Sequence, residues 1–270
     1  MSKSTSAPLI RDVADFLKDF APPSLAEEWD NVGLLVGDDA LPARRIMTCL
    51  SVYPAVAEEA IAKRADLIVS HHPFPFQAIK RITTSSLDGA LLWRLIGAGV
   101  SVYSPHTGFD SAAEGINAQL ARGLELQNIR PLAPIKGRPS DGLGAGRLGE
   151  MPAGSALAGL IAKVKRFLRV EAVQVVGAPD RPVKTVAVAC GSGGSFLSAA
   201  AQAGADALVT GEARFHSCLE AEWRGVALVL PGHFASERFA LDDLAQRLQA
   251  KFPDAVVWAS EAESDPLRWA

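Results

Sequence analysis

The chain is predicted to be an α/β protein built from two similar lobes with mainly parallel sheets. Short β-branched apolar runs alternate with alanine-rich helical stretches along most of its 270 residues, as is typical of parallel α/β units. A weak internal repeat indicates two related lobes, because residues 65–70 resemble residues 205–210 and, next in order, residues 99–102 resemble residues 225–228. Polar residues follow the repeated strands, so we expect a ligand site outside the carboxyl ends of these strands.

Local signals in the first part of the chain predict its elements in order. A helix over residues 12–20 ends before Pro22-Pro23, and residues 29–34 form a turn that enters a strand. After it, the sequence predicts strands over residues 46–52, 66–70 and 100–104, and helices over residues 55–64, 87–97 and 112–123.

Residues 127–150 interrupt this alternation. Prolines gather around Pro131 and Pro134, and glycines follow from Gly142 to Gly149, so the segment is interpreted as a connection between the lobes. Beyond it, the sequence predicts helices at 157–168, 199–203 and 236–251, and strands at 173–176, 186–189, 207–209, 226–230 and 256–258. We therefore assign residues 1–126 with 232–270 to the first lobe and residues 127–231 to the second.

Composition narrows the class of protein. The net charge of −3 offers no basic field, so a nucleic-acid partner has no electrostatic support. Three scattered cysteines exclude a disulfide framework or a cysteine-rich zinc site. No stretch approaches eighteen uninterrupted apolar residues and residues 1–8 form no apolar signal core, so we expect no membrane span and a cytoplasmic location.

All five histidines occupy positions that suit metal binding. Most follow predicted strands, and the carboxyl ends of parallel strands are where open α/β sheets bind ligands. Carboxylates accompany them at a spacing of four residues, which puts both side chains on one face of a helix. The set consists of His71, His72, His106 with Asp110, His233 with Glu237, and His216 after Glu212.

Each cluster by itself has a simpler explanation, namely a helix cap beside a solvated acid. Three such clusters at three strand ends favour a metal site. Adjacent side chains diverge, so His71 and His72 would serve two ions rather than chelate one. Imidazole and carboxylate donors without thiolate indicate zinc, iron or manganese, and two ions about 3.5–4 Å apart would share a water and lower its pKa. The Gly191–Gly194 loop is either a phosphate cradle or a tight turn without a ligand.

Taken together, the motifs resemble the NIF-three-like family, also known as GTP cyclohydrolase 1 type 2 homologs. The matching stretches occur in family order and span nearly the whole chain: residues 28–34, 70–73, 106–110, 190–195, 210–212 and 232–237. The resemblance implies a two-lobed α/β subunit with a dinuclear metal centre in the cleft and a ring-like homohexamer. Where the family has an aspartate and a threonine, this chain has Ser51 and Tyr53.

The resemblance also implies roles for individual residues. His72 and Asp110 would bind one metal ion, His71 and His233 would bind the other, and Glu237 would bridge both. His106 would lie next to the ligands and orient a ligand or substrate, and His216 and Glu212 would line the same cleft.

Two functions remain open from the sequence. The first is a metal-dependent hydrolase of a nucleotide or another phosphorylated or heterocyclic small molecule. In it, Glu237 fixes the two ions and His106 or His216 moves a proton. The second is a non-enzymatic metal-binding, metal-handling or regulatory assembly, in which the centre is structural.

Overall fold

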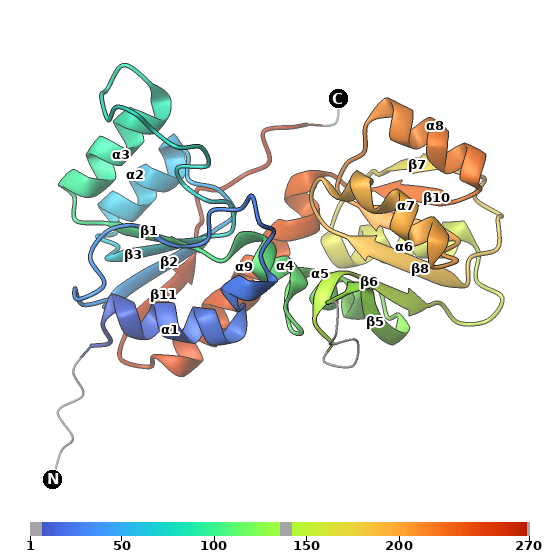
Figure 1. Cartoon of the computed structure of the whole chain (residues 1–270), viewed down its shortest axis with the longest axis horizontal. Coiled ribbons are helices and arrows are strands. Elements are labelled where there is room, and N and C mark those ends of the chain that lie inside the picture. The colour runs from blue at the N-terminus through green and yellow to red at the C-terminus, as the bar shows by residue number, and fades with distance from the viewer. Residues whose placement is uncertain (1–6, 136–141, 269–270) are drawn as a thin grey trace, which may run out of the picture. The chain divides into compact units, whose positions relative to one another are not determined.

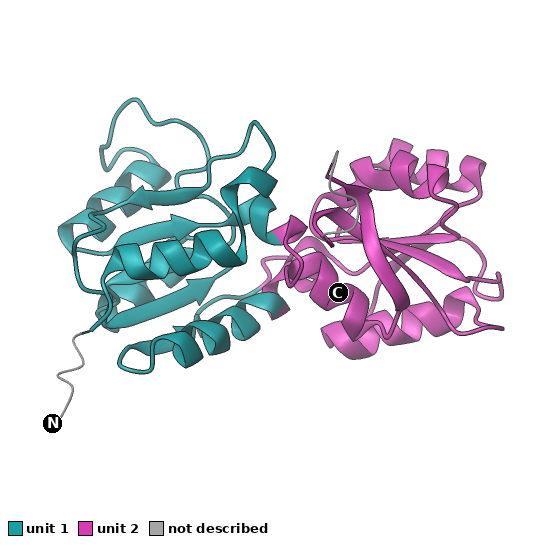
Figure 2. Ribbon diagram, turned by 60° about the horizontal axis from the view of Figure 1, so that its bottom comes forward, with its two compact units in different colours: residues 1–109, 240–264 teal, residues 110–239, 265–270 magenta. Residues whose placement is uncertain are grey.

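The protein is described by a computed structural model covering residues 7–135 and 142–268, and it divides into two compact units. Unit 1 comprises residues 1–109 and 240–264, and unit 2 comprises residues 110–239 and 265–270 (Figure 2). Each unit is a mixed β-sheet with helices on its two faces (Figure 1). The predicted fold class, two α/β lobes, is confirmed.

Unit 1 is built on a five-stranded sheet in which four neighbouring strands are parallel. Strand β1 pairs antiparallel with β4 and forms one edge of the sheet. In spatial order, the strands are β1 (Gly33–Val36), β4 (Ser101–Ser104), β3 (Leu67–Ser70), β2 (Arg45–Cys49) and β11 (Val256–Ala259).

Helices cover both faces of this sheet because its strands are apolar on both sides. Met47, Ile68 and Val102 pack in one buried cluster with α2 (Pro54–Ala62) and α3 (Leu87–Gly97). On the opposite face, the Thr48 hydroxyl donates to the Leu241 carbonyl oxygen of α9 (His233–Lys251) at 2.8 Å. The remaining helical segments of unit 1 are α1 (Ile10–Phe20), the 3₁₀ turn Pro23–Leu25 and the start of α4 (His106–Ser111).

Unit 2 contains a six-stranded sheet with a parallel centre and antiparallel strands on both sides. Its parallel strands β8, β9 and β10 continue on one side into the antiparallel pair β6 and β5, and on the other into β7. In spatial order, the strands are β5 (Gln127–Pro134), β6 (Gly144–Glu150), β8 (Thr185–Ala189), β9 (Ala207–Thr210), β10 (Ala227–Leu230) and β7 (Gln174–Val176).

Alternation of side chains along these strands separates two helical layers. Val186 and Val188 pack with α5 (Ile116–Gly123) and α6 (Leu157–Leu168). Ala187 and Ala189 point to the other face, which is covered by α7 (Leu197–Gln202) and α8 (Phe215–Arg224). A 3₁₀ turn over Gly193–Phe196 precedes α7.

The internal repeat seen in the sequence corresponds to equivalent structure in the two units. Residues 61–70 and 201–210 have the same succession of helix end, turn and strand, with the same order of buried and exposed side chains. The Asp66 carboxylate accepts the amide hydrogens of Arg44 and Arg45 at 2.7 and 2.8 Å. Asp206 accepts those of Lys184 and Thr185 at 2.9 and 2.8 Å, so each aspartate fixes the start of the neighbouring strand.

The interpretation of residues 127–150 as a connection was wrong for the residues that the structure describes, because they form β5 and β6 (residues 136–141 lie outside the described part). Pro131 and Pro134 are tolerated because β5 is an edge strand. A Cβ on Gly144, whose φ is +141°, would lie 2.3 Å from the Ala133 carbonyl oxygen, so glycine permits this pairing. Helix α8 was not predicted either.

The division between the units passes through two helices. Helix α4 contributes residues up to Phe109 to unit 1 and begins unit 2 at Asp110, and α9 passes to unit 1 at Ala240. Residues 110–126, assigned from the sequence to the first lobe, pack with unit 2, whose core contains Leu120 and Leu124. Within residues 7–135 and 142–268, no helix is long and apolar enough to cross a membrane.

Candidate metal centre

Three histidines of unit 1 come together where two parallel strands end. His71 and His72 follow β3, and His106 follows β4 after one proline. Because β3 and β4 are neighbours, their carboxyl ends present these side chains at one edge of the sheet. Ring nitrogens of all three histidines lie within 4.8 Å of one another. This spacing allows them to share a metal ion.

The two adjacent histidines are held by both backbone and side-chain hydrogen bonds. The amides of His71 and His72 donate to the carbonyl oxygens of Cys49 and Leu50, at 2.9 and 2.8 Å, and so extend the pairing of β2 with β3. The Ser51 hydroxyl lies 2.7 Å from His72 Nδ1. His71 is buried, with 1% of its surface exposed, whereas His72 is half-buried. The Ser51 hydroxyl therefore holds the His72 ring at Nδ1.

A carboxylate to which the sequence assigned no role positions the third histidine. Asp30 Oδ1 accepts from His106 Nδ1 at 2.7 Å, and Asp30 Oδ2 accepts from the amide and hydroxyl of Thr107. Burial raises the pKa of Asp30, but the hydrogen bonds from His106 and Thr107 outweigh it and lower the pKa to about 2. Asp30 is thus the carboxylate partner that commonly orients a metal-site histidine. Its motif, residues 28–34, was the signal that could have indicated it.

Two exposed aromatic rings border the histidine cluster. Trp29 and Phe76 lie edge-on to the His106 ring, with centroid distances of 6.0 and 6.1 Å. Their side chains are 65% and 55% exposed, which is unusual for rings of this size. The cluster therefore has apolar surface on its solvent side, beside polar nitrogen donors.

In unit 2, His233 lies between two carboxylates. Helix α9 begins at His233, so His233 and Glu237 share one face, as the sequence predicted. His233 Nε2 lies 3.0 Å from Glu237 Oε2, and His233 Nδ1 lies 3.0 Å from Glu212 Oε1. Burial lowers the pKa of His233, but Glu237 and Glu212 outweigh it and raise the pKa to about 9. The two carboxylates therefore favour a positive charge at this imidazole.

Asp110 is anchored by residues from the middle of unit 2. The Cys190 thiol donates to Asp110 Oδ1 at 3.1 Å. Asn117 donates to the Asp110 carbonyl oxygen and accepts from the Cys190 amide, at 3.1 and 2.8 Å. Burial, followed by the charges of Asp110 and Glu237, raises the pKa of Cys190 well above its usual range. Cys190 is buried, and it also helps to position a carboxylate.

The glycine loop after β8 is shaped by the acidic residue next to it. A Cβ on Gly191, whose φ is +59°, would lie 2.0 Å from Glu237 Oε1. The amide of Gly191 donates to the Ser236 hydroxyl at 2.9 Å, which ties the loop to the start of α9. Glycine at this position therefore has a structural reason that is independent of phosphate binding.

The structure separates the remaining candidate from these clusters. His216 is the second residue of α8, where its side chain is exposed and its ring lies 5.8 Å from that of Phe215. Glu212, in contrast, contacts His233 directly.

The donor groups fit divalent metal ions. Unit 1 offers three imidazoles, and unit 2 offers His233 with the carboxylates of Glu237 and Asp110. The raised pKa keeps Cys190 a neutral thiol, so this donor set is nitrogen and oxygen, which suits zinc, iron or manganese. These groups could hold metal, and they include all five ligands expected from the sequence: His71, His72, Asp110, His233 and Glu237.

Comparison with known families gives one match over almost the whole chain. The sequence profile of Duf34/NIF3 (NGG1p interacting factor 3) matches residues 8–266. The GTP cyclohydrolase 1 type 2 homolog of Clostridium acetobutylicum is 32% identical, over 96% of this chain and 98% of that protein. The NIF3-like protein 1 of Drosophila melanogaster is 33% identical, over 93% of this chain and 86% of that protein.

Solved structures agree with the fold. A hypothetical protein of Staphylococcus aureus superposes with a TM-score of 0.89 and 27% identity, covering 98% of this chain and all of that one. A Bacillus cereus protein related to NIF3 has the same TM-score of 0.89 at 23% identity, which supports the fold alone.

Proposed function

The chain belongs to the Duf34/NIF3 family, and on that premise we propose that it is a metal-dependent hydrolase with a dinuclear centre. Its substrate is a nucleotide or another phosphorylated or heterocyclic small molecule, in keeping with the relatives named GTP cyclohydrolase 1 type 2 homologs. His72 and Asp110 would hold one divalent ion, His71 and His233 would hold the other, and Glu237 would serve both.

The observation that carries this proposal is the histidine cluster of unit 1. Three neighbouring rings lie together there, with a nitrogen of one held by a serine and a nitrogen of another held by a buried carboxylate. This arrangement is the one that metal sites use, because the outer hydrogen bond sets the tautomer of each ligand. Such hydrogen bonds hold the rings of His72 and His106, one from each of the two strand ends.

His106 is the proton-transfer residue in this proposal. Asp30 is ionised at neutral pH, so it accepts the hydrogen of His106 Nδ1 and leaves Nε2 to take up a proton. Bound divalent ions supply a nucleophilic water near neutral pH and polarise a phosphoryl or carbonyl oxygen. Glu237 and Asp110 neutralise positive charge at the centre, and the exposed His216 remains a second candidate for moving the proton.

A non-enzymatic metal-handling or regulatory assembly is the second candidate function. Phe215, Leu219 and Trp223 recur every fourth residue on α8 and are 71%, 48% and 83% exposed. An apolar stripe of this kind is typical of a surface that another protein chain covers. It favours association, in keeping with the homohexamer expected from the family resemblance.

Metal content and turnover test the two candidates together. The purified protein is loaded with zinc, iron or manganese, and the bound metal per subunit is measured beside a His72→Ala/Glu237→Ala variant. We expect two ions per subunit in the parent, loss of most metal in the variant, and hydrolysis of at least one nucleotide or phosphoester only by the parent. Glu222→Ala, an exposed glutamate on α8, is the matched control and should keep both properties.

The outcomes separate clearly. Two bound ions without turnover above the double variant would favour the metal-handling assembly. Less than one ion per subunit under saturating metal would contradict the ligand assignment itself.

A further inference from the structure

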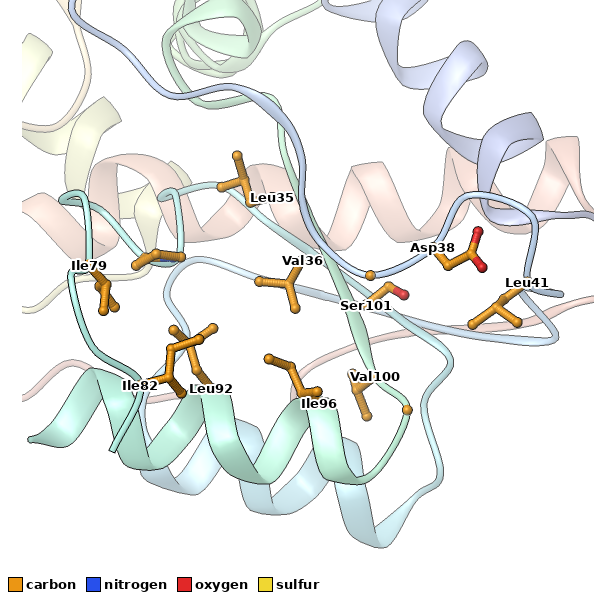
Figure 3. Close-up of a pocket in the computed structure, with 13 residues that line it drawn as sticks. Leu35, Val36, Asp38, Leu41, Ile79, Ile82, Leu92, Ile96, Val100 and Ser101 are labelled. Atoms are coloured by element: carbon orange, nitrogen blue, oxygen red, sulfur yellow. The ribbon is translucent and has the colours of Figure 1, made fainter. Parts of the chain in front are cut away.

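Unit 1 contains a cavity of about 590 Å³ that belongs to neither histidine nor carboxylate cluster (Figure 3). It is bounded by the edge strand β1, by α3 and by the segment that contains Ile79 and Ile82. Val100 and Ser101 line it at the start of β4, whereas His106 follows the end of that strand. The lining also includes Pro75, three residues after His72, but it contains none of the histidines or carboxylates of the candidate metal centre. The volume of the cavity is in the range of small-molecule sites, about 300–1,000 Å³.

The walls of this cavity are aliphatic. In Figure 3, the side chains of Ile79, Ile82 and Leu92 gather at one end, with Val36 and Ile96 beside them. Among the described residues that line it, none has an aromatic ring or a basic side chain. Branched aliphatic walls offer neither stacking nor hydrogen bonds, so they favour a saturated chain over a planar ring.

Part of this apolar wall is open to solvent. Leu41, Ile82 and Ile96 are 44%, 47% and 52% exposed. An alkyl chain in the cavity would remove this surface from water, which is the main driving force for binding apolar ligands. The exposed wall is thus the part of the cavity that gains most from a ligand.

A charged side chain, that of Asp38, lies at the end of the cavity opposite Ile79. Asp38 and Leu41 lie together there, and Asp38 is the one charged side chain that the structure describes in the lining. Asp38 Oδ1 accepts the amide hydrogen of Ala40 at 2.9 Å, which holds the carboxylate in place. A carboxylate without a basic neighbour in the described lining repels fatty acids and phosphates, and it attracts a cationic head group.

We propose that this cavity binds a medium-length saturated alkyl chain with a primary amine at its head. The chain lies along Val36, Leu92 and Ile96, and the ammonium group lies at the Asp38 carboxylate. This site is separate from the proposed metal chemistry and does not depend on it.

Calorimetric titration of the full-length protein at pH 7 with octylamine, 1-octanol and octanoate tests the proposal. These probes carry alkyl chains of matched length and differ mainly in the charge of the head. We expect one saturable site per subunit, with octylamine binding at least tenfold more tightly than octanoate and 1-octanol lying between them.

Variants locate the site. Ile96→Gln should weaken octylamine at least tenfold, and Ile82→Gln gives a second test in a different wall; both side chains are about half exposed, so the fold is retained. Leu87→Gln is the matched control, because Leu87 is 61% exposed on the same helix as Ile96 but does not line the cavity. Asp38→Asn should reduce octylamine to the affinity of 1-octanol.

Three results would overturn the proposal. They are no saturable binding of any probe, octylamine affinity unchanged in both Ile96→Gln and Ile82→Gln, or octanoate binding as tightly as octylamine.

Discussion

Units 1 and 2 share one frame and differ in the residues that end their strands. In each, a parallel strand, a helix and a second parallel strand follow one another, and an aspartate before the second strand fixes the first. After the second strand, unit 1 has His71 and His72 where unit 2 has Gly211 and Glu212. The frame is thus set by backbone pairing, whereas the chemistry is set by a few residues beyond it.

In both units, a serine forms a hydrogen bond to a polar residue that follows the second strand. Ser51 contacts His72 in unit 1, and Ser192 donates to Glu212 in unit 2, from the loops that follow β2 and β8. One frame therefore presents an imidazole-rich group in unit 1 and a carboxylate-rich group in unit 2. The type of donor group can thus change between the units while the position that presents it is kept.

The largest effect should come from the two aspartates that define the shared frame. Asp66→Ala and Asp206→Ala each leave two strand amides without their acceptor, so each should lower the free energy of unfolding by about 3 kcal/mol. Urea unfolding measures both. Effects that differ by more than about twofold would show that the two frames are not equivalent in energy, and Asp38→Asn should leave stability nearly unchanged.

Gly191→Ala disturbs the close approach of the glycine loop to Glu237, which exists in unit 2 alone. The new methyl group would meet Glu237 Oε1 and would force alanine into a φ of +59°, so the free energy of unfolding should fall by about 2 kcal/mol. Ser51→Ala, in the corresponding loop of unit 1, makes no such clash. Thermal unfolding of both variants is the measurement, and an unaffected Gly191→Ala protein would mean that Glu237 moves away freely.

Glu59 stabilises unit 1 in a way that has no counterpart among the described contacts of unit 2. Burial raises the pKa of Glu59, but hydrogen bonds from Ser260, Lys63 and the amides of residues 261–262 lower it to about 2. Its folded pKa is below its unfolded value of 4.5, so its stabilisation is present above pH 4.5 and is lost as the pH falls toward 2.

Substitution of Glu59 tests whether its stabilisation is lost as the pH falls. Glu59→Gln should lower the free energy of unfolding by about 1.5 kcal/mol at pH 7, because a charged acceptor is lost. The difference from the parent should shrink between pH 4.5 and pH 2, measured by urea unfolding across that range. A difference that grows on acidification would contradict the assignment.

The smallest expected effect is a difference in metal affinity between variants of Ser51 and Ser192. Ser51→Ala removes the group that orients His72 and should weaken metal binding about tenfold, or about 1.4 kcal/mol. Ser192→Ala acts on Glu212, which reaches a proposed ligand only through His233, so its effect should be less than threefold. Competition with a chelator measures both, and equal losses would mean that Glu212 itself binds the ion.

Much of this fold was predictable because periodic burial leaves a clear signal. The helices at 87–97 and 157–168 were predicted with their observed ends, and the repeat by itself indicated two lobes. Strands β5 and β6 were missed because prolines and glycines that usually break regular strands are accommodated at a sheet edge. Helix α8 was missed because its apolar residues face outward, opposite to the usual pattern.

The candidate site was predictable to a similar extent. Histidines and carboxylates after strands could be found from spacing, since strand ends gather at one edge of a sheet. Asp30 was assigned no role, because its contact with His106 spans 76 residues of sequence and depends on the turn before β1. The motif of residues 28–34 was the one signal that pointed to it. The hydrogen bond from the Cys190 thiol could not be predicted from the sequence, since nothing near Cys190 indicates Asp110 as its acceptor.

The discontinuity of unit 1 has a consequence for the order of folding during synthesis. Strand β11 pairs with β2 and belongs to the same unit, although about 200 residues separate them in the chain. Synthesis completes the continuous stretch 110–239 before it adds residues 240–264, so all strands of unit 2 are made while unit 1 still lacks its fifth strand and the second half of α9. Unit 1, whose synthesis begins first, is thus completed last. Until β11 is made, β2 remains an open sheet edge that a chaperone or another nascent chain could engage.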